Sequence, residues 1–375
     1  MNNILAFIKR QLCKVILYAF RMFPIDKQKY VFSSYFSTKY NDNPRAIFEA
    51  MRSMHPEKKY IWLLRDTSIN IDDAIVINAN SLKALYHLAT AKCWIDNCRK
   101  RSWVVKRSQQ KYVQTWHGGI ALKRVEADVE DKLPHLYVKA AKRDSKMADV
   151  FLSGSKWQTE SIKRSYWYDG TVLEFGLPRS DVFFNNKAIT NINNTYQLKS
   201  DIRVLMYAPT FRADEDLDCY NMDYNAIIKT LRHKFGDEWI IFLRLHPNIS
   251  YKSNEIHAEN IIDVSSFQDI NELIIRSDIL ITDYSSCMFD AMIAGKIVFI
   301  FATDIDKYSD DRGFEFSFDE LPFDISKSNE ELVNNIKYFN EEDYRTKIEL
   351  FKNAVRIYEN GDASNRVAKY IFENL

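Results

Sequence analysis

The chain has 375 residues, of which 46% are hydrophobic and 14% aromatic, so it can build the cores of about two domains of ordinary size. Its 52 basic and 51 acidic side chains give a formal net charge of +1, which argues against a protein that binds nucleic acid through a general positive field. Five scattered cysteines indicate free thiols in a reducing compartment rather than a disulfide framework or a zinc site.

Residues 1–24 form a basic amphipathic segment. At about 100° per residue, Arg10, Lys14 and Arg21 cluster on one side of a helix, with Lys9 on the flank. The apolar positions that gather opposite are Leu5, Ile8, Leu12, Val15, Ile16, Ala19 and Phe23. No apolar run approaches the roughly 18 residues of a membrane span, and no small-residue cleavage site follows. The pattern predicts a helix lying on an anionic membrane surface; a helix packed against the protein body is the alternative.

From Lys29 onward, short apolar runs alternate with segments of helical spacing, which predicts βα units and parallel sheets. In the first half we expect strands at 30–36, 60–64, 93–97, 111–116 and 149–154, and helices at 44–54 and 82–91. In the second half we expect strands at 204–209, 239–245, 261–264, 279–282 and 298–301, helices at 224–235, 270–276 and 289–294, and two or three helices within 329–375.

The polar stretch 185–201 separates the two series. The predicted architecture is α/β, with two doubly wound, Rossmann-like domains and a cleft between them. We place the N-terminal domain at 25–190 and the C-terminal domain, which ends in helices, at 191–375. The ligand is expected in the cleft.

The first candidate site is Gln114–Gly119, QTWHGG, which follows an expected strand. His117 at a strand end is suited to general-base work near neutral pH. Trp116, Gly118 and Gly119 lie beside it, and glycine lets a ligand approach the backbone closely. We therefore predict His117 as a catalytic base, with these three residues beside it.

Three further motifs follow expected strands in the second half. In YAPTFR, Thr210 and Arg212 offer a hydroxyl and a cation, and in RLHPN, Arg244 and His246 alternate and so project to one face. The third is the hydroxyl pair Ser265 and Ser266. Taken alone, YAPTFR is weak evidence and the serine pair adds little. For RLHPN a functional pair is favoured over a strand-terminal surface pair.

The run Ile279–Ser286, ILITDYSS, continues into CMFDAMIAGK and predicts a buried strand, a hydroxyl-rich turn and a helix. Ser285 and Ser286 would begin that helix, where free N–H groups and the positive dipole end favour an anion. We predict a phosphate cradle there. Arg312, in the apparent loop DRG, is a weaker candidate.

Because parallel strands bring their carboxyl ends to one edge of a sheet, these residues are expected to converge. Two imidazoles, arginines and hydroxyl-rich helix starts suit a diphosphate and a hydroxyl that must lose its proton. The sequence lacks the Gly-rich motifs of P-loop ATPases and of nicotinamide dehydrogenases, and the nucleophile elbow of α/β-hydrolases.

Together the motifs resemble the CDP-glycerol glycerophosphotransferase family, the enzymes of teichoic-acid primase and polymerase type. The matching stretches are YVFSSYFSTKYNDNPRAIFEAM (30–51), QTWHGGIALKR (114–124), SGSKWQTESIKRSYWY (153–168), FGLPRSD (175–181), YAPTFR (207–212), LRLHPN (243–248), ITDYSSCMFDAMIAGK (281–296), DRGFEF (311–316) and NGDASNRVAKYI (360–371). The resemblance covers nearly the whole chain after Phe23.

The resemblance implies a GT-B fold and transfer of a polyol phosphate from a CDP-activated donor, with CMP leaving. It implies that His117 is the acceptor-side base, with Trp116, Gly118 and Gly119 on the acceptor side. It also implies that His246 is a second catalytic histidine at the donor. Arg212, Arg244, Asp283, Ser285, Ser286 and Arg312 would hold the donor diphosphate or cytidine. The family's membrane association implies a peripheral enzyme at the cytoplasmic face of the cell membrane.

Two departures leave the substrates open. Gly119 and Ile120 stand where the family usually has threonine and proline, and LPFD at 321–324 replaces a Pro-Gly-Pro. The donor is thus CDP-glycerol, CDP-ribitol or another CDP-polyol, and the acceptor a lipid-linked glycan or polyol phosphate in a teichoic-acid-like or capsule-like polymer. A divalent ion such as Mg²⁺ is left open, because no carboxylate cluster of the metal-binding type is evident. The alternatives are a GT-B glycosyltransferase that uses a nucleotide sugar, and a non-catalytic nucleotide- or lipid-binding membrane protein.

Overall fold

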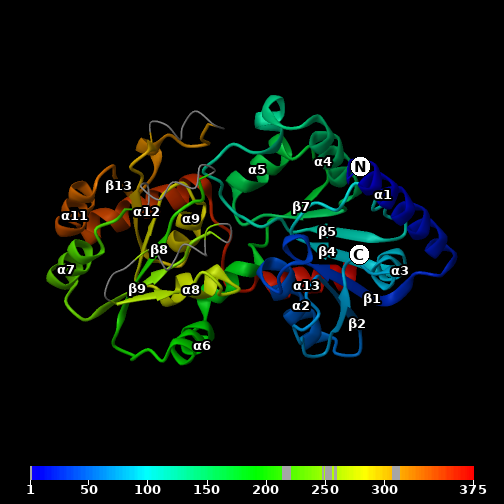
Figure 1. Cartoon of the computed structure of the whole chain (residues 1–375), viewed down its shortest axis with the longest axis horizontal. Coiled ribbons are helices and arrows are strands. Elements are labelled where there is room, and N and C mark those ends of the chain that lie inside the picture. Colours follow the sequence, from blue (N-terminus) through cyan, green and yellow to red (C-terminus); the bar gives the residue numbers. More distant parts are fainter. Residues whose placement is uncertain (1, 213–220, 247–248, 250–255, 257–259, 306–312) are drawn as a thin grey trace. The chain divides into compact units, whose positions relative to one another are not determined.

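The computed structural model describes residues 2–212, 221–246, 249, 256, 260–305 and 313–375. The chain divides into two compact units (Figure 1). Unit 1 comprises Met1–Gly118, Val125–Asp181 and Tyr358–Leu375, and unit 2 comprises Gly119–Arg124 and Val182–Ile357. The C-terminal residues from Tyr358, which the sequence prediction placed in the second domain, therefore belong to unit 1.

Among the described residues, unit 1 contains a parallel seven-stranded sheet of order β3-β2-β1-β4-β5-β6-β7. Its strands are β1 (Asp26–Ser33), β2 (Lys59–Leu64), β3 (Ile75–Asn78), β4 (Ala91–Asp96), β5 (Lys111–Gln114), β6 (Val150–Leu152) and β7 (Thr171–Leu173). The sequence analysis missed β3 and β7. Both are short strands at the sheet edges, where half-exposed residues give little hydrophobic signal.

Helices cover both faces of this sheet, as expected for parallel strands that are apolar on both sides. Tyr30, Phe32 and Trp62 point to one face and pack in a cluster with α2 (Asp42–Met54) and α13 (Ala363–Asn374), which lie side by side in Figure 1. Val31 and Trp94 point to the other face, toward α1 (Asn2–Ala19) and α3 (Leu82–Thr90). The docking of α13 on α2 explains why the end of the chain returns to unit 1.

Two helices of unit 1 were not predicted from the sequence: α4 (His135–Met147) and α5 (Lys156–Ser165). The buried face of α5 consists of Gln158, Thr159, Ser161, Ile162 and Ser165, and the buried face of α4 includes Asp144 and Ser145. A face this polar gives no hydrophobic periodicity to detect.

The helix α1 packs against the protein body at one end and leaves most of its apolar side exposed. It thus shares a feature with each of the two expected arrangements, the membrane-surface helix and the packed helix. Leu17 is buried against α3, and the Phe20 ring meets Tyr86 edge-on at 5.7 Å. The predicted apolar side remains largely exposed along Leu5, Ile8, Leu12 and Val15, whose exposed fractions range from 54% to 64%. No helix in the described part of the chain is both long and apolar enough to span a membrane.

Unit 2 contains, within its described residues, a parallel six-stranded sheet of order β10-β9-β8-β11-β12-β13. The strands are β8 (Arg203–Ala208), β9 (Trp239–Leu243), β10 (Ile261–Asp263), β11 (Ile279–Thr282), β12 (Ile297–Phe301) and β13 (Asp324–Ser326). The helices are α6 (Lys187–Tyr196), α7 (Tyr224–Phe235), α8 (Ile270–Arg276), α9 (Cys287–Ile293), α11 (Asn329–Lys337) and α12 (Glu341–Val355).

The polar stretch 185–201, expected to separate the two series, includes the helix α6. Ala188 and Ile192 are its buried positions, and it packs on α8. Gln197 ends the helix in the left-handed region with φ 53°. Two apolar anchors are enough to hold the helix, although they are too few to stand out in the sequence.

Candidate active site

In each unit the strand order reverses once, between β1 and β4 in unit 1 and between β8 and β11 in unit 2. The crevice outside the carboxyl ends of such strands is where doubly wound folds bind ligands. The predicted residues His117, Thr210, Arg212 and Asp283 all lie at these two switch points or directly beside them.

His117 follows β5, and one backbone contact fixes its ring. The ring nitrogen Nδ1 lies 2.9 Å from the carbonyl oxygen of Asn97, just after β4. Because a carbonyl only accepts, Nδ1 carries the proton and donates, which leaves the lone pair on Nε2. The Trp116 ring stacks on the imidazole at 4.8 Å, and the Tyr35 ring lies tilted beside it at 5.7 Å. A half-buried imidazole oriented in this way is competent as a general base.

Side chains from several elements hold the WHG backbone in place. Asn43 Nδ2 donates to the Trp116 carbonyl at 3.0 Å, and Arg179 Nη1 donates to the His117 carbonyl at 2.8 Å. The same Arg179 atom pairs with Asp42 at 3.0 Å, and both side chains are nearly fully buried. Gln158 donates to the Gly118 carbonyl at 2.9 Å. A Cβ built on Gly118 meets no described atom within 4 Å, so there is room beside this backbone.

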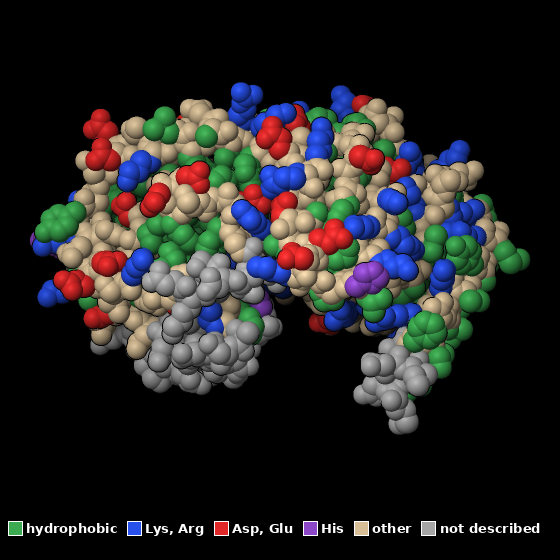
Figure 2. All heavy atoms as spheres, turned by 90° about the horizontal axis from the view of Figure 1, so that it is seen from above, with side chains coloured by type: hydrophobic (Ala, Val, Ile, Leu, Met, Phe, Trp, Pro, Cys, Tyr) green, Lys and Arg blue, Asp and Glu red, His purple; other side chains and the backbone are tan. Residues whose placement is uncertain are grey.

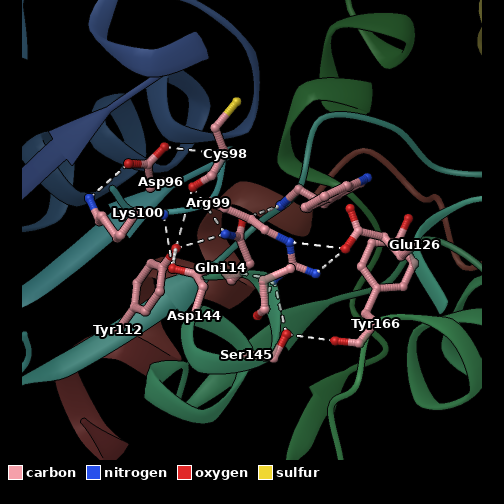
Figure 3. Close-up of polar contacts among 12 residues, drawn as sticks. Asp96, Cys98, Arg99, Lys100, Tyr112, Gln114, Glu126, Asp144, Ser145 and Tyr166 are labelled. Carbon is pink, nitrogen blue, oxygen red and sulfur yellow. Dashed lines mark hydrogen bonds and ion pairs between the residues drawn. The ribbon is translucent and has the colours of Figure 1, made fainter. Parts of the chain in front are cut away.

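Arg99 is the centre of a buried charged cluster (Figure 3). Arg99 Nη2 contacts Glu126 at 2.7 Å, and Arg99 Nη1 contacts Asp144 at 3.4 Å. The guanidinium also lies over the Trp116 ring, 5.3 Å from its centroid. Burial raises the pKa of Asp144 to about 6, although the Arg99 charge acts in the opposite direction. Arg99 thus connects two carboxylates to the ring that stacks on His117.

The candidate donor residues of unit 2 centre on Arg212. Its Nη2 donates to Asp283 at 2.9 Å, and its Nε donates to Asp304 at 2.7 Å. Asp283 also accepts from the Thr210 backbone N–H at 2.8 Å and from the Thr210 hydroxyl. The Tyr284 hydroxyl donates to Asp304 at 2.8 Å. Asp283 thus orients Thr210 and Arg212, and its predicted contact with the donor stays a prediction.

Arg212 and Asp304 each stabilise the charged form of the other. Burial acts to lower the pKa of Arg212, but its hydrogen bonds with Asp304 and Asp283 outweigh this effect and hold the pKa above its usual range. Burial likewise acts to raise the pKa of Asp304, and the bonds from Arg212 and Tyr284 turn the net shift downward. Arg212 and Asp304 therefore stay ionised over a wide pH range.

The other predicted donor residues lie at neighbouring strand ends. Arg244 follows β9 directly and donates to the carbonyls of Val264 and Phe267, each at 2.9 Å. Ser265 accepts from the Leu245 N–H at 2.9 Å, whereas His246 and Ser266 are exposed. The His246 ring lies 5.4 Å from the ring of Phe211.

Ser285 and Ser286 precede α9 and are partly exposed, as the predicted strand–turn–helix motif requires. Arg312 lies outside the described residues. Gly119 belongs to unit 2, where the neighbouring Arg124 N–H donates to the Gly313 carbonyl at 3.2 Å. Within the described residues, no group of three or more His, Cys, Asp or Glu is arranged to hold a metal ion.

Comparison with known proteins gives a family for this chain. The model of the family described as CDP-Glycerol:Poly(glycerophosphate) glycerophosphotransferase matches residues 15–373. The chain belongs to this family. The predicted resemblance is therefore confirmed over nearly the whole chain.

The relatives include a teichoic acid poly(glycerol phosphate) polymerase of Bacillus subtilis, 33% identical over 93% of this chain and 49% of the relative. A teichoic acid glycerol-phosphate transferase of Staphylococcus aureus is 30% identical over 93% of this chain and 94% of the relative. The chain thus spans about half the length of the first relative and nearly all of the second.

Among solved structures, a variant of the wall teichoic acid polymerase TagF soaked with CDPG matches with a TM-score of 0.86 and 31% identity. The match covers 100% of this chain and 95% of that one. Together with the two parallel sheets, it confirms the predicted GT-B class with Rossmann-like domains. The cleft between the domains stays a prediction.

Several residues that build the site were not singled out from the sequence. Asp42, Asn43 and Arg179 fall within the family stretches YNDNPRAIF and LPRSD, so their motifs were noticed but their roles were not. Arg99 and Asp304 lie in no quoted motif. The roles of a buried arginine and a loop aspartate become evident only in the structure, because their partners are distant in sequence.

Proposed function

We propose that this protein transfers glycerol phosphate, or a related polyol phosphate, from a CDP-activated donor to a hydroxyl of its acceptor and releases CMP. Family membership over residues 15–373 is the observation that carries the proposal. The arrangement of His117 supports it, because Nε2 keeps a lone pair while Nδ1 donates to Asn97. The relatives that are named for polymerisation or transfer of glycerol phosphate support the glycerol donor first.

In the proposed reaction, the acceptor hydroxyl oxygen attacks the polyol-bearing phosphorus of the donor. The new bond forms between that oxygen and the phosphorus, and the hydroxyl proton passes to His117 Nε2. The bond from the same phosphorus to the bridging oxygen breaks, and the electron pair leaves on CMP. General-base catalysis of this kind contributes roughly 10²–10⁴ in rate.

The donor-side proposal rests on unit 2. Arg212 is fixed by two carboxylates, and one of them, Asp283, precedes by two residues the serine pair that begins with Ser285 in front of α9. Cations and oriented donors stabilise charge on a transferring phosphoryl group, which is most of the catalytic work in such reactions. Ser285, Ser286, Arg244 and His246 stay predicted donor residues, and Mg²⁺ stays an expectation that chelation with EDTA would test.

We further propose a peripheral position at the cytoplasmic face of the membrane, with a lipid-linked glycan or polyol-phosphate acceptor. The support is the exposed apolar side of α1, with Lys9, Arg10 and Lys14 exposed on the same helix. Figure 2 shows hydrophobic side chains beside Lys and Arg at the right-hand end of the view, near the N-terminal helix. A helix of this kind binds anionic lipid by apolar insertion and by charge.

Product analysis tests the activity. Purified protein is incubated with CDP-glycerol, CDP-ribitol and a nucleotide sugar, each with a lipid-linked acceptor, and the released nucleotide is identified. CMP release from a CDP-polyol supports the proposal. Release of a nucleoside diphosphate would instead indicate a glycosyltransferase.

Co-sedimentation with phosphatidylglycerol vesicles tests the membrane position. Leu12→Glu and Val15→Glu, on the exposed side of α1, should reduce binding several-fold, whereas Leu350→Glu on α12 should not. Equal binding of all three variants would remove α1 from this role.

A further inference from the structure

A cavity in unit 1 lies at the switch point of the sheet and has no role in the mechanism above. Its volume is about 50 Å³, which is room for more than one water molecule. Ser33 at the end of β1 and Asp96 at the end of β4 both line it, so it opens where the strand order reverses. This is the position at which doubly wound sheets bind ligands.

The polar wall of the cavity is rich in cations. Arg99, Lys100 and Arg101 come from one segment directly after β4, and Asp96 is the single carboxylate among the lining residues. Lys100 Nζ pairs with Asp96 at 2.7 Å, and Arg99 is held by Glu126 and Asp144 (Figure 3). Since neither Glu126 nor Asp144 lines the cavity, the carboxylates that balance Arg99 lie behind the wall.

Arg101 differs from its two neighbours in sequence. Its guanidinium donates only weakly to the Asn80 side-chain oxygen, at 3.4 Å, and no carboxylate in the described part of the chain forms an ion pair with it. Burial, together with the like charge of Arg65, lowers the pKa of Arg101. An arginine without a carboxylate partner is stabilised when an anion binds beside it.

The cavity also offers hydroxyl donors. Ser33 Oγ and Ser37 Oγ are buried and lie 3.0 Å apart, so one hydroxyl donates to the other. That bond uses one of the two protons and leaves the second to donate to a ligand. Leu63, Leu88 and Trp103 form an apolar wall opposite, against which a short carbon chain can pack.

The residues that line the cavity are direct sequence neighbours of residues that contact His117. Phe36 and Ser37 line the cavity, and the adjacent Tyr35 ring lies against the His117 ring. Asp96 lines the cavity, and the next residue, Asn97, accepts the Nδ1 proton of His117. Tyr35, Phe36 and Ser37 all have positive φ, between 45° and 65°, a strained conformation that persists where the surroundings enforce it.

We propose that this cavity binds a phosphate group of the acceptor and so places the neighbouring hydroxyl at His117. The inference rests on the proposed function and narrows its acceptor to molecules that carry a phosphate close to the attacked hydroxyl. Arg101, Lys100 and the serine pair hold the phosphate oxygens, and the apolar wall contacts the polyol carbons. A glycan with no phosphate near its hydroxyl lacks the group that this cavity recognises.

Calorimetric titration of the full chain tests the proposal, with sn-glycerol 3-phosphate as the probe and glycerol as its phosphate-free match. Arg101→Gln should weaken glycerol 3-phosphate binding about tenfold or more, as expected for loss of a charge-assisted contact. Arg101→Lys should recover part of the affinity. The matched control is Arg164→Gln, an exposed arginine of α5 that pairs with Asp128 and does not line the cavity. It should bind like the wild type.

CDP-glycerol binding, measured on the same samples, separates the two proposals. Equal glycerol 3-phosphate affinity in wild type and Arg101→Gln, with donor binding intact, overturns the cavity assignment alone. If the wild type does not bind CDP-glycerol, the proposed function is overturned instead. Phosphatidylglycerol vesicles form a third arm: if Arg101→Gln weakens vesicle binding but not glycerol 3-phosphate binding, the cavity takes a lipid headgroup, and the acceptor assignment is wrong.

Discussion

The two switch points of this protein are built from opposite chemistry. In unit 1, His117 is oriented by a backbone carbonyl and stacked on Trp116, and its neighbouring backbone is fixed by Asn43 and Arg179. In unit 2, the corresponding crevice holds a buried guanidinium between two carboxylates. The first arrangement keeps a lone pair available, and the second keeps a cation rigid. The same fold thus supports proton transfer at one sheet and charge stabilisation at the other.

The largest expected effect comes from removing the base. His117→Ala should lower CMP release by roughly 10²–10⁴, because it removes the group that is proposed to accept the hydroxyl proton. The affinity for CDP-glycerol should stay within about twofold, since donor binding is assigned to unit 2. Steady-state CMP release and donor titration check the two parts. Wild-type turnover in this variant would remove His117 from the mechanism.

Breaking the unit 2 cluster should act on stability first. Arg212→Gln leaves Asp283 and Asp304 without their cation and should cost about 3–5 kcal/mol of folding free energy, as expected for a broken buried ion pair. Arg203→Gln, at a partly exposed pair on the first residue of β8, should cost about 1 kcal/mol or less. Urea unfolding measures both. Similar losses of folding free energy in the two variants would contradict the larger stabilising role assigned to the ion pairs of Arg212.

Acid should affect the two units differently. Because the folded state raises the pKa of Asp144 to about 6, the stability it contributes is fully present below its ordinary value of 3.8 and is lost as pH rises through about 6. The pKa of Asp304 is lowered, so its contribution is present above 3.8 and is lost only as pH falls below that value. As the pH rises from 4 to 6, Asp144 should therefore cost unit 1 no more than about 3 kcal/mol of stability, whereas Asp304 should contribute almost no change to unit 2.

Hydrogen exchange of β4 and β8 over this pH range, corrected for intrinsic rates, measures the difference. Asp144→Asn should remove the part of the pH dependence of unit 1 that comes from Asp144. A matching decline in both units would mean that the two buried clusters respond to protons in the same way.

The smallest effect should come from the support of the WHG backbone. Arg179→Lys keeps the charge but cannot hold Asp42 and the His117 carbonyl in the same geometry, so kcat should fall about tenfold with donor KM unchanged. The matched control is Arg45→Lys, at the exposed pair with Glu49 on α2, which should be near wild type. Rates of CMP release over a range of CDP-glycerol concentrations separate kcat from KM. A rise in donor KM alone would contradict the positioning role.

The sequence predicted the architecture because the central strands are continuous apolar runs. Strands such as β2 and β11, and helices such as α7 and α8, were predicted at or within one residue of their bounds. Elements whose buried residues are mostly polar, or whose residues are only partly buried, were not predicted. Examples are α5 and the edge strands β3, β7 and β13. Of the site, the sequence predicted His117 and Arg212, whose motifs are local. It did not predict Arg99 or Asp304, whose roles arise only from contacts distant in sequence.

The division of roles between the two switch points is tested most directly by hydrogen exchange of the His117→Ala protein with and without CDP-glycerol. In this variant the donor binds without being consumed. With CDP-glycerol bound, we expect the backbone amides from β8 through Arg212 and from β11 through α9 to exchange more slowly. These segments contain predicted donor-binding residues. Protection confined to the strand ends of unit 1, at 33–43 and 96–101, would contradict this division of roles.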